Sequence, residues 1–497
     1  MSTAKKILSN TVTQMIGRAI MALSSVVILK AIANFLSVEG YGMYTAIYEF
    51  LAFFGIVADL GLFTIAIREM GKGERSREFI IGNIFAMRLV MGVLAMTLAV
   101  LSAFLIPKYN GTYIPIGVAI ASISVFFAIM HGTVSSVLQV ELKMERATIG
   151  LVGGKLISLA WMLIAIYYVF EQQASPAGFY QLIVAGVVGN FFAFLYTFWY
   201  ALKYTKIRPQ FVREYWLEIF KTSVPYGTAL VLSMIYFRIG SIMLLFMRGP
   251  TEVGLFGVPM RVLEILSVIP VYFMNSTLPT LSAAIKNGGG KVTRILELSF
   301  QFLWMAALPI VTGVWILAYP IIFIIASPEF LSRVEDHYYG SDIALKILAF
   351  AMFFSFLNSL FTYALVAVNK QSHLLWINGS AAVLNVAANF IVIPLYGFRG
   401  AGVITVITEI YILIVAWLVA RKYLSFKFKI LPFVKIIVAT AVMGVVVYFL
   451  REPSYHWLGL QNLNVLLLAA LGATIYLALL YLFGAIPEEF LRRKVRE

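Results

Sequence analysis

FIIGNIFAMRLVMGVLAMTLAVLSAFLI, residues 79–106, decides the fold: it is a long run of almost entirely apolar residues that contains a single charge, Arg88. A helix of this length rises about 40 Å, which exceeds the roughly 30 Å of hydrocarbon in a bilayer. An apolar run of this length with so few charges is typical of a membrane-spanning segment. The run therefore predicts a transmembrane helix.

The rest of the chain has the same character. Of its 497 residues, 61% are hydrophobic and 12% are charged, and the mean hydropathy is +0.92. Apolar runs recur from end to end with short polar breaks, so no soluble domain longer than a loop is expected. The N-terminal segment lacks the short apolar run and cleavage site of a removable signal peptide, and the first helix is expected to stay in the mature protein.

The runs predict an all-α integral membrane protein with about 14 transmembrane helices. We expect two pseudosymmetric six-helix bundles followed by a C-terminal helix pair. The expected spans are 11–36, 41–66, 79–106, 112–138, 148–170, 178–202, 222–247, 253–278, 295–325, 342–368, 374–394, 400–420, 431–450 and 463–486.

The basic residues lie mainly on one side of this topology. With the N-terminus inside, 26 of the 38 Lys and Arg residues fall in inner segments and five in outer loops. The positive-inside rule then predicts a multi-pass protein of the cell (cytoplasmic, inner) membrane with both termini in the cytoplasm. The formal net charge of +15 mostly reflects topology, and we expect no nucleic-acid partner.

Several chemistries are disfavoured by composition. The chain has no cysteine, which excludes disulfides and thiolate sites, and its histidines, His131, His337, His373 and His456, are scattered without metal-ligand spacing. No phosphate-cradling glycine-rich loop or catalytic triad appears. We therefore expect no metal site, no cofactor, no ATP hydrolysis and no enzyme activity.

A weak internal repeat links two segments at an offset of 212 residues. VEGYGMYTAIYEF begins at Val38 and TEVGLFGVPMRVLE begins at Thr251, so that Gly42 corresponds to Gly254. Both segments open a helix with the same inside-to-outside sense, which predicts parallel repeats with a cavity between two halves. The expected domains are a six-helix bundle at 1–210, a second at 211–425, and the last two helices with a basic cytoplasmic tail at 426–497.

Three segments resemble one known family. They are LSVEGYGMYTAIYEFLAFFGIVADLGLFTIAIRE from Leu36, PYGTALVLSMIYFRIGSIMLLFMRGPTEVGLFGVPMRVLEIL from Pro225 and LNVAANFIVIPLYGFRGAGVITVITE from Leu384. Their order and spacing resemble the polysaccharide-export, or lipid-linked oligosaccharide, flippases of the multidrug/oligosaccharidyl-lipid/polysaccharide (MOP) superfamily. The family usually has an acid two positions after the arginine of the seventh helix, whereas Gly240 stands there after Arg238.

The resemblance implies a transporter that moves lipid-linked oligosaccharides, on a polyprenyl phosphate or pyrophosphate, from the inner to the outer leaflet for surface polysaccharide biosynthesis. Alternating access of a cationic cavity between the two bundles is the implied mechanism. The implied partners are the lipid-linked substrate, the bilayer, glycan-assembly enzymes and a coupling proton or sodium ion, and we take a monomer as the default.

Charges inside the expected spans are the candidate functional residues, because a charge at bilayer depth costs from roughly 3 to over 10 kcal/mol unless it faces a partner or a wet cavity. Seven bases and four acids lie there, not counting Lys435, Glu297 and Asp342 close to the span ends. Lys155 and Lys346 lie near helix ends and are expected to snorkel to the interface. The candidate substrate-binding cations are Arg18, Lys30, Arg88, Arg238 and Arg261, and the candidate coupling or charge-balancing acids are Glu49, Asp59 and Glu264, with Glu409 as the fourth acid.

A structural interpretation stands beside this functional one. Arg88 and Asp59 lie at depths that permit a helix-to-helix pair with only a structural role. Arg261 and Glu264, three residues apart on one helix face, can satisfy each other.

Two other functions stay open. A proton- or sodium-coupled drug or cation antiporter of the same superfamily would need a cavity dominated by acids, which the excess of intramembrane bases disfavours. A glycan polymerase or ligase would need a longer outer loop than the chain offers.

Overall fold

The computed structural model describes residues 3–286, 291–333, 335–426, 428–457, 464–487 and 489. These residues form helices joined by short connections, and the described residues contain no strand beyond one isolated bridge, Arg333 to Tyr338. The predicted fold class, an all-α membrane protein, is confirmed. The predicted basic tail from Arg492 onward lies outside the described residues, as does Lys427.

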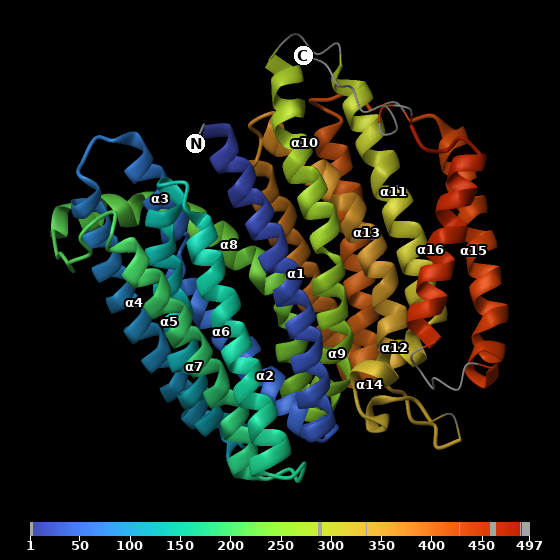
Figure 1. The fold of residues 1–497 in the computed structure, drawn as a ribbon, viewed down its shortest axis with the longest axis horizontal. Helices are drawn as coiled ribbons and strands as arrows, with labels where there is room; N and C mark the ends of the chain where they lie inside the picture. The colour runs from blue at the N-terminus through green and yellow to red at the C-terminus, as the bar shows by residue number, and fades with distance from the viewer. Residues whose placement is uncertain are drawn as a thin grey trace. The chain divides into compact units, whose positions relative to one another are not determined.

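The chain divides into two compact units, 1–254 and 255–497, which are described separately (Figure 1). The predicted domain boundaries at residues 210 and 425 stay predictions. The first unit contains α1 (Thr3–Phe35), α2 (Val38–Asp59), α3 (Leu62–Lys72), α4 (Arg77–Leu105), α5 (Ile114–Val140), α6 (Met144–Ile164) with a short π-helical end, α7 (Pro176–Ala201), α8 (Arg213–Met247) and the first turn of α9 (Pro250–Leu266).

Among the described residues, the second unit contains the rest of α9 and seven further α-helices. Within it, α15 and α16 lie side by side, and their buried residues pack together with the end of α11 (Figure 1). The helices are α10 (Val268–Lys286), α11 (Val292–Ile316), α12 (Ala318–Ile325), α13 (Ser341–Ala367), α14 (Ser372–Ala420), α15 (Ile430–Trp457) and α16 (Asn464–Leu482).

Twelve helical segments of the described residues are long and apolar enough to cross a membrane. One of them, α14, would be about 70 Å long if straight, more than twice the hydrocarbon thickness. It is bent at Gly397, which has φ 56° and ψ −138°, and it contains both predicted runs 374–394 and 400–420. The number of crossings rises to about fourteen, as predicted, when α14 is counted as two crossings and α8, which contains the run 222–247, is added.

Two predicted spans are interrupted. The run 41–66 is divided between α2 and α3, because Leu60 and Gly61 have left-handed backbones with φ 41° and 74° that end one helix and start the next. The run 253–278 is divided between α9 and α10 at Ser267. Pro270 lies in the first turn of α10, where a missing backbone N–H costs nothing, whereas Pro259 lies inside α9.

The repeated segments contact each other within the first unit. A Cβ added at Gly42 would overlap the carbonyl oxygen of Pro250, and one added at Gly254 would overlap the carbonyl oxygen of Val38. The contact is reciprocal, because Val38 and Pro250 are related by the same offset of 212 residues as the two glycines. Reciprocal contacts of this kind are typical of two copies around a local two-fold axis. Glycine at both positions lets the two backbones approach closely.

Candidate functional site: intramembrane charge pairs

The interruption between α2 and α3 positions the first candidate acid. Asp59 is the last residue of α2, and the N–H of Leu60 donates to the carbonyl oxygen of Ile56 to close that helix. The C-terminal end of a helix carries partial negative charge, so an acid here favours a cation nearby. Arg88 of α4 supplies that cation.

Arg88 and Asp59 form a hydrogen-bonded ion pair across two helices. The side chain of Arg88 is 4% exposed and that of Asp59 is 27% exposed. Only Nη2 of Arg88 donates to Asp59, while its Nε and Nη1 are buried without a hydrogen-bond partner in the described chain. Gly132 of α5 lies against the guanidinium. A Cβ added at Gly132 would be in van der Waals contact with the guanidinium of Arg88. Among the described residues, Asp59 thus supplies the one hydrogen-bond partner of a deeply buried cation.

A second pair joins α2 to α8. Arg238 Nη1 donates to Glu49 Oε2 at 2.5 Å, and the two side chains are 25% and 9% exposed. Glu49 comes from a helix 189 residues away along the chain. Glu49 therefore provides the counter-charge of Arg238, a role for which the resemblance leads one to expect an acid near position 240.

The third pair lies in the second unit, on one face of α9. Arg261 Nη1 donates to Glu264 Oε2 at 2.6 Å, and the two side chains are 34% and 29% exposed. The spacing i, i+3 predicted this contact, which the structure confirms. Of the three pairs, this one is the most accessible.

The two candidate cations of the first helix, Arg18 and Lys30, are exposed on α1. Twelve residues separate them, which places them about 120° apart around the helix. Six of the eight candidates therefore form three pairs with one another, and the side chains of the other two are exposed on α1. That a cavity lies between the two halves stays a prediction.

Lys346, Glu409 and three intramembrane amides contact neighbouring side chains. Lys346 lies over the ring of Trp315 at 5.6 Å, and Asn358 donates to the carboxylate of the buried Glu409. Asn389 donates to Asn385 at 2.8 Å and Asn385 donates to Thr408 at 3.0 Å. Asn358 thereby connects α13 to α14, and the bond from Asn385 to Thr408 connects the two parts of α14 on either side of Gly397.

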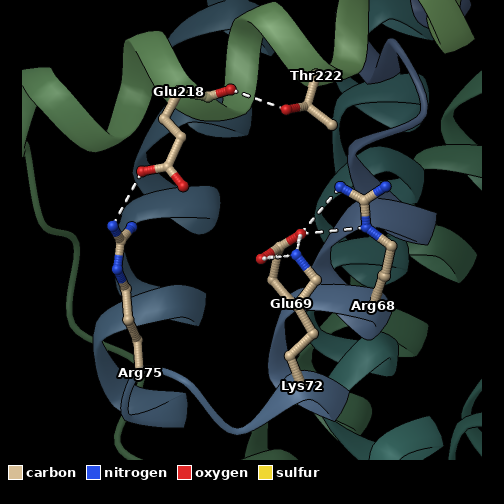
Figure 2. Close-up of polar contacts among 6 residues, drawn as sticks. All are labelled: Arg68, Glu69, Lys72, Arg75, Glu218 and Thr222. Carbon is tan, nitrogen blue, oxygen red and sulfur yellow. Dashed lines mark hydrogen bonds and ion pairs between the residues drawn. The ribbon is translucent and has the colours of Figure 1, made fainter.

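The basic end of the first unit holds a second group of charges, outside the apolar spans (Figure 2). Arg75 donates to Glu218 of α8 at 3.0 Å and lies 4.5 Å from the ring of Tyr215. The hydrogen bond that Arg75 donates to Glu218 raises the pKa of Arg75, and burial raises the pKa of Tyr215 to about 12. Beside them, Glu69 accepts from Arg68 at 2.9 Å and from Lys72 at 3.1 Å.

Sequence reasoning missed one residue at this end. Asn83 of α4 is buried; it accepts from the N–H of Val212 at 3.0 Å and donates to Gln210 Oε1 at 3.3 Å. It thereby holds the connection between α7 and α8 against α4. An amide inside the apolar run 79–106 was the available signal, because a buried amide requires partners.

A chain whose described residues form many helices long and apolar enough to cross a membrane is a multi-spanning membrane protein. A family model described as "Polysaccharide biosynthesis protein" matches residues 4–285, and the chain belongs to this family. The resemblance proposed from the sequence is thereby confirmed.

Solved structures share the fold at low sequence identity. A lipid II flippase MurJ in an inward closed conformation has 14% identity and a TM-score of 0.75, with 98% of this chain and all of that chain covered. An inward-facing multidrug-resistance MATE transporter of the MOP superfamily has 15% identity and a TM-score of 0.64, with 81% and 94% covered. A MOP transporter from Pyrococcus furiosus has 16% identity and a TM-score of 0.58, with 84% and 95% covered. No curated protein matches the chain by sequence.

Proposed function

We propose that this protein flips lipid-linked oligosaccharides, on a polyprenyl phosphate or pyrophosphate, from the inner to the outer leaflet for surface polysaccharide biosynthesis. The observation that carries the proposal is that a member of the polysaccharide biosynthesis family holds partly exposed arginines within its predicted spans, each against a carboxylate. The protein works by exposing these cations alternately to the two sides of the membrane.

The pairs suit this task because the substrate carries an anion through hydrocarbon. Moving a phosphate and a hydrated sugar across the bilayer is costly, and a fixed cation lowers that barrier. Arginine presents a planar fork that binds phosphate oxygens in a bidentate manner and stays charged at any depth. When the phosphate takes the place of the carboxylate, the released acid can accept a proton or sodium ion, which would couple transport to an ion gradient.

The pairs differ in how readily a phosphate reaches them. Arg261 and Arg238 are about a third and a quarter exposed, so they make the first contacts with the headgroup. Arg18 and Lys30 are exposed and add positive charge along α1. Arg88 is enclosed and becomes available only if Asp59 moves with the break between α2 and α3.

The charge of the predicted spans supports the antiporter alternative less well than the flippase. Organic cations require net negative charge at bilayer depth, whereas the predicted spans hold more bases than acids. Proton-coupled efflux of a cationic dye from vesicles, without movement of lipid-linked glycans, would favour it.

The setting of the proposal follows from the charge distribution. We propose a monomer in the cytoplasmic membrane with both termini in the cytoplasm, working beside glycan-assembly enzymes and organised as bundles at 1–210 and 211–425 with a final helix pair at 426–497. The 26-to-5 distribution of bases between inner and outer segments supports this orientation.

Translocation by reconstituted protein tests the proposal. Vesicles receive a fluorescent polyprenyl-pyrophosphate oligosaccharide, and its loss from one leaflet is followed for wild type and for Arg238→Ala and Arg261→Ala. Losing one charge-assisted hydrogen bond to phosphate is expected to slow translocation about ten- to hundredfold. Arg333→Ala is the matched control, because Arg333 pairs with Asp336 in an exposed loop.

The same assay includes Arg18→Ala and Arg88→Ala. Normal translocation by all four variants, with every lipid-linked glycan offered, would refute the cationic mechanism. Failure of the wild type to move any of these lipids would refute the function itself.

A further inference from the structure

The connection between α7 and α8 is fixed to the end of α4 rather than left loose. The N–H of Gln210 donates to the carbonyl oxygen of Gly82 at 3.1 Å, and Asn83 binds both Gln210 and Val212. Ile207 is buried beside these bonds. The start of α8 is therefore held at a defined position relative to α4.

The first turns of α8 are amphipathic. Tyr215 and Ile219, four residues apart, are buried, whereas Leu217 and Phe220 on the other side are 52% and 43% exposed. Glu218 connects this segment to Arg75 (Figure 2). A helix with one face packed on protein and large apolar side chains exposed on another is typical of a segment at the membrane interface.

A hollow of about 390 Å³ lies between this segment and α4. Its volume is within the range of small-ligand sites. Five of its six lining residues are apolar, and the sixth is a cation: Met87, Phe211, Trp216, Leu217 and Phe220, with Arg213. Such a lining fits a hydrocarbon chain with an anionic group at one end.

Arg213 lines the hollow, and further exposed bases lie on the connection that precedes it in the chain. Lys206, Arg208 and Arg213 are exposed on the connection and at the start of α8. Lys203 lies 3.9 Å from the ring of Trp199 at the end of α7, an arrangement typical of the aromatic belt where headgroups lie. Clusters of bases on an amphipathic segment attract anionic lipids.

We propose that this hollow binds an anionic phospholipid of the surrounding bilayer. One acyl chain occupies the space among Phe211, Leu217 and Phe220, and the phosphate pairs with Arg213. The inference does not depend on the transported substrate, because the hollow lies outside the intramembrane charge pairs. Bound lipid would fix the start of α8, whose later turns carry Arg238.

Native mass spectrometry of the delipidated full chain tests this site. Phosphatidylglycerol and phosphatidylcholine are titrated separately into wild type, Arg213→Gln and Leu217→Trp. Arg213→Gln is expected to lower the affinity for phosphatidylglycerol about fivefold and to leave that for phosphatidylcholine unchanged. Leu217→Trp, which fills the hollow, is expected to lower binding of both lipids.

Arg333→Gln is the control, because it removes an exposed arginine far along the chain from the hollow. Equal retention of phosphatidylglycerol by wild type and both hollow variants would overturn the proposal. So would displacement of phosphatidylglycerol by an equal concentration of polyprenyl phosphate, since the hollow would then belong to the transported lipid. Leu217→Trp keeps the test decisive if Arg213→Gln does not fold.

Discussion

Two ion pairs of the same chemistry, Arg88–Asp59 in the first unit and Arg261–Glu264 in the second, occupy different environments. Arg88 is 4% exposed and reaches an acid on another helix, whereas Arg261 is 34% exposed and reaches an acid one turn away. Both arginines stand in apolar sequence, so composition does not distinguish them. The difference shows that burial and the origin of the partner decide whether a membrane arginine supports the fold or remains available to a ligand.

The two pairs are therefore expected to differ in how much free energy of unfolding is lost when one member is removed. Removing one member of a buried pair leaves an uncompensated charge and costs about 3 to 5 kcal/mol. A partly exposed i, i+3 pair is worth only about 0.2 to 1 kcal/mol. We therefore expect the buried pair to control stability and the exposed pair to control transport.

The largest expected effect is that of Arg88→Met. The substitution leaves Asp59 without its cation and is expected to lower the free energy of unfolding by about 3 to 5 kcal/mol. Unfolding of the purified protein by SDS, followed by tryptophan fluorescence, measures the change.

Arg261→Met is the matched comparison and should lower that free energy by no more than about 1 kcal/mol. The double variant Asp59→Leu, Arg88→Met should recover most of the loss, because two apolar groups replace the pair. Equal losses for Arg88→Met and Arg261→Met would abolish the distinction between the two pairs.

The pair Arg238–Glu49 is intermediate and sharpens the comparison. Its acid is buried and its arginine is a quarter exposed, so Glu49→Gln keeps the shape of the acid while removing its charge. We expect a loss of about 1 to 3 kcal/mol, the cost of a weakened hydrogen bond to a charged group. The same unfolding experiment measures it, and a loss larger than that of Arg88→Met would reverse the proposed order.

The spans and the Arg261–Glu264 pair could be predicted from sequence because their determinants are local. Apolar length fixes a helix in a membrane, and the spacing of Arg261 and Glu264 fixes a common face. The depth of Arg88 and Asp59 indicated that they could pair, but not that Arg88 would be enclosed. Burial depends on neighbours such as Gly132, which comes from α5.

The pair Arg238–Glu49 could not be predicted, because its members are 189 residues apart and only the packing of α2 with α8 brings them together. The early start of α8 at Arg213 was missed for another reason. Its first turns are amphipathic rather than apolar, so a search for apolar runs begins the helix near residue 222. The break after Asp59 depends on a left-handed Leu60, a residue type that rarely adopts this conformation.

The smallest expected effect on stability is that of an exposed ion pair in the second unit. Arg294 donates to Glu489 at 2.7 Å, and this hydrogen bond lowers the pKa of Glu489 below its usual 4.5. Because the folded pKa is lowered, the contact stabilises the protein above the unfolded pKa and is lost as pH falls through the folded pKa. The side chains are 44% and 48% exposed, so the contribution is at most a few tenths of a kcal/mol. Thermal unfolding of wild type and Glu489→Gln at about pH 7 and about pH 3 measures it, with a small difference expected at the higher pH and none at the lower. A difference that grew on acidification would contradict the assignment of this pair.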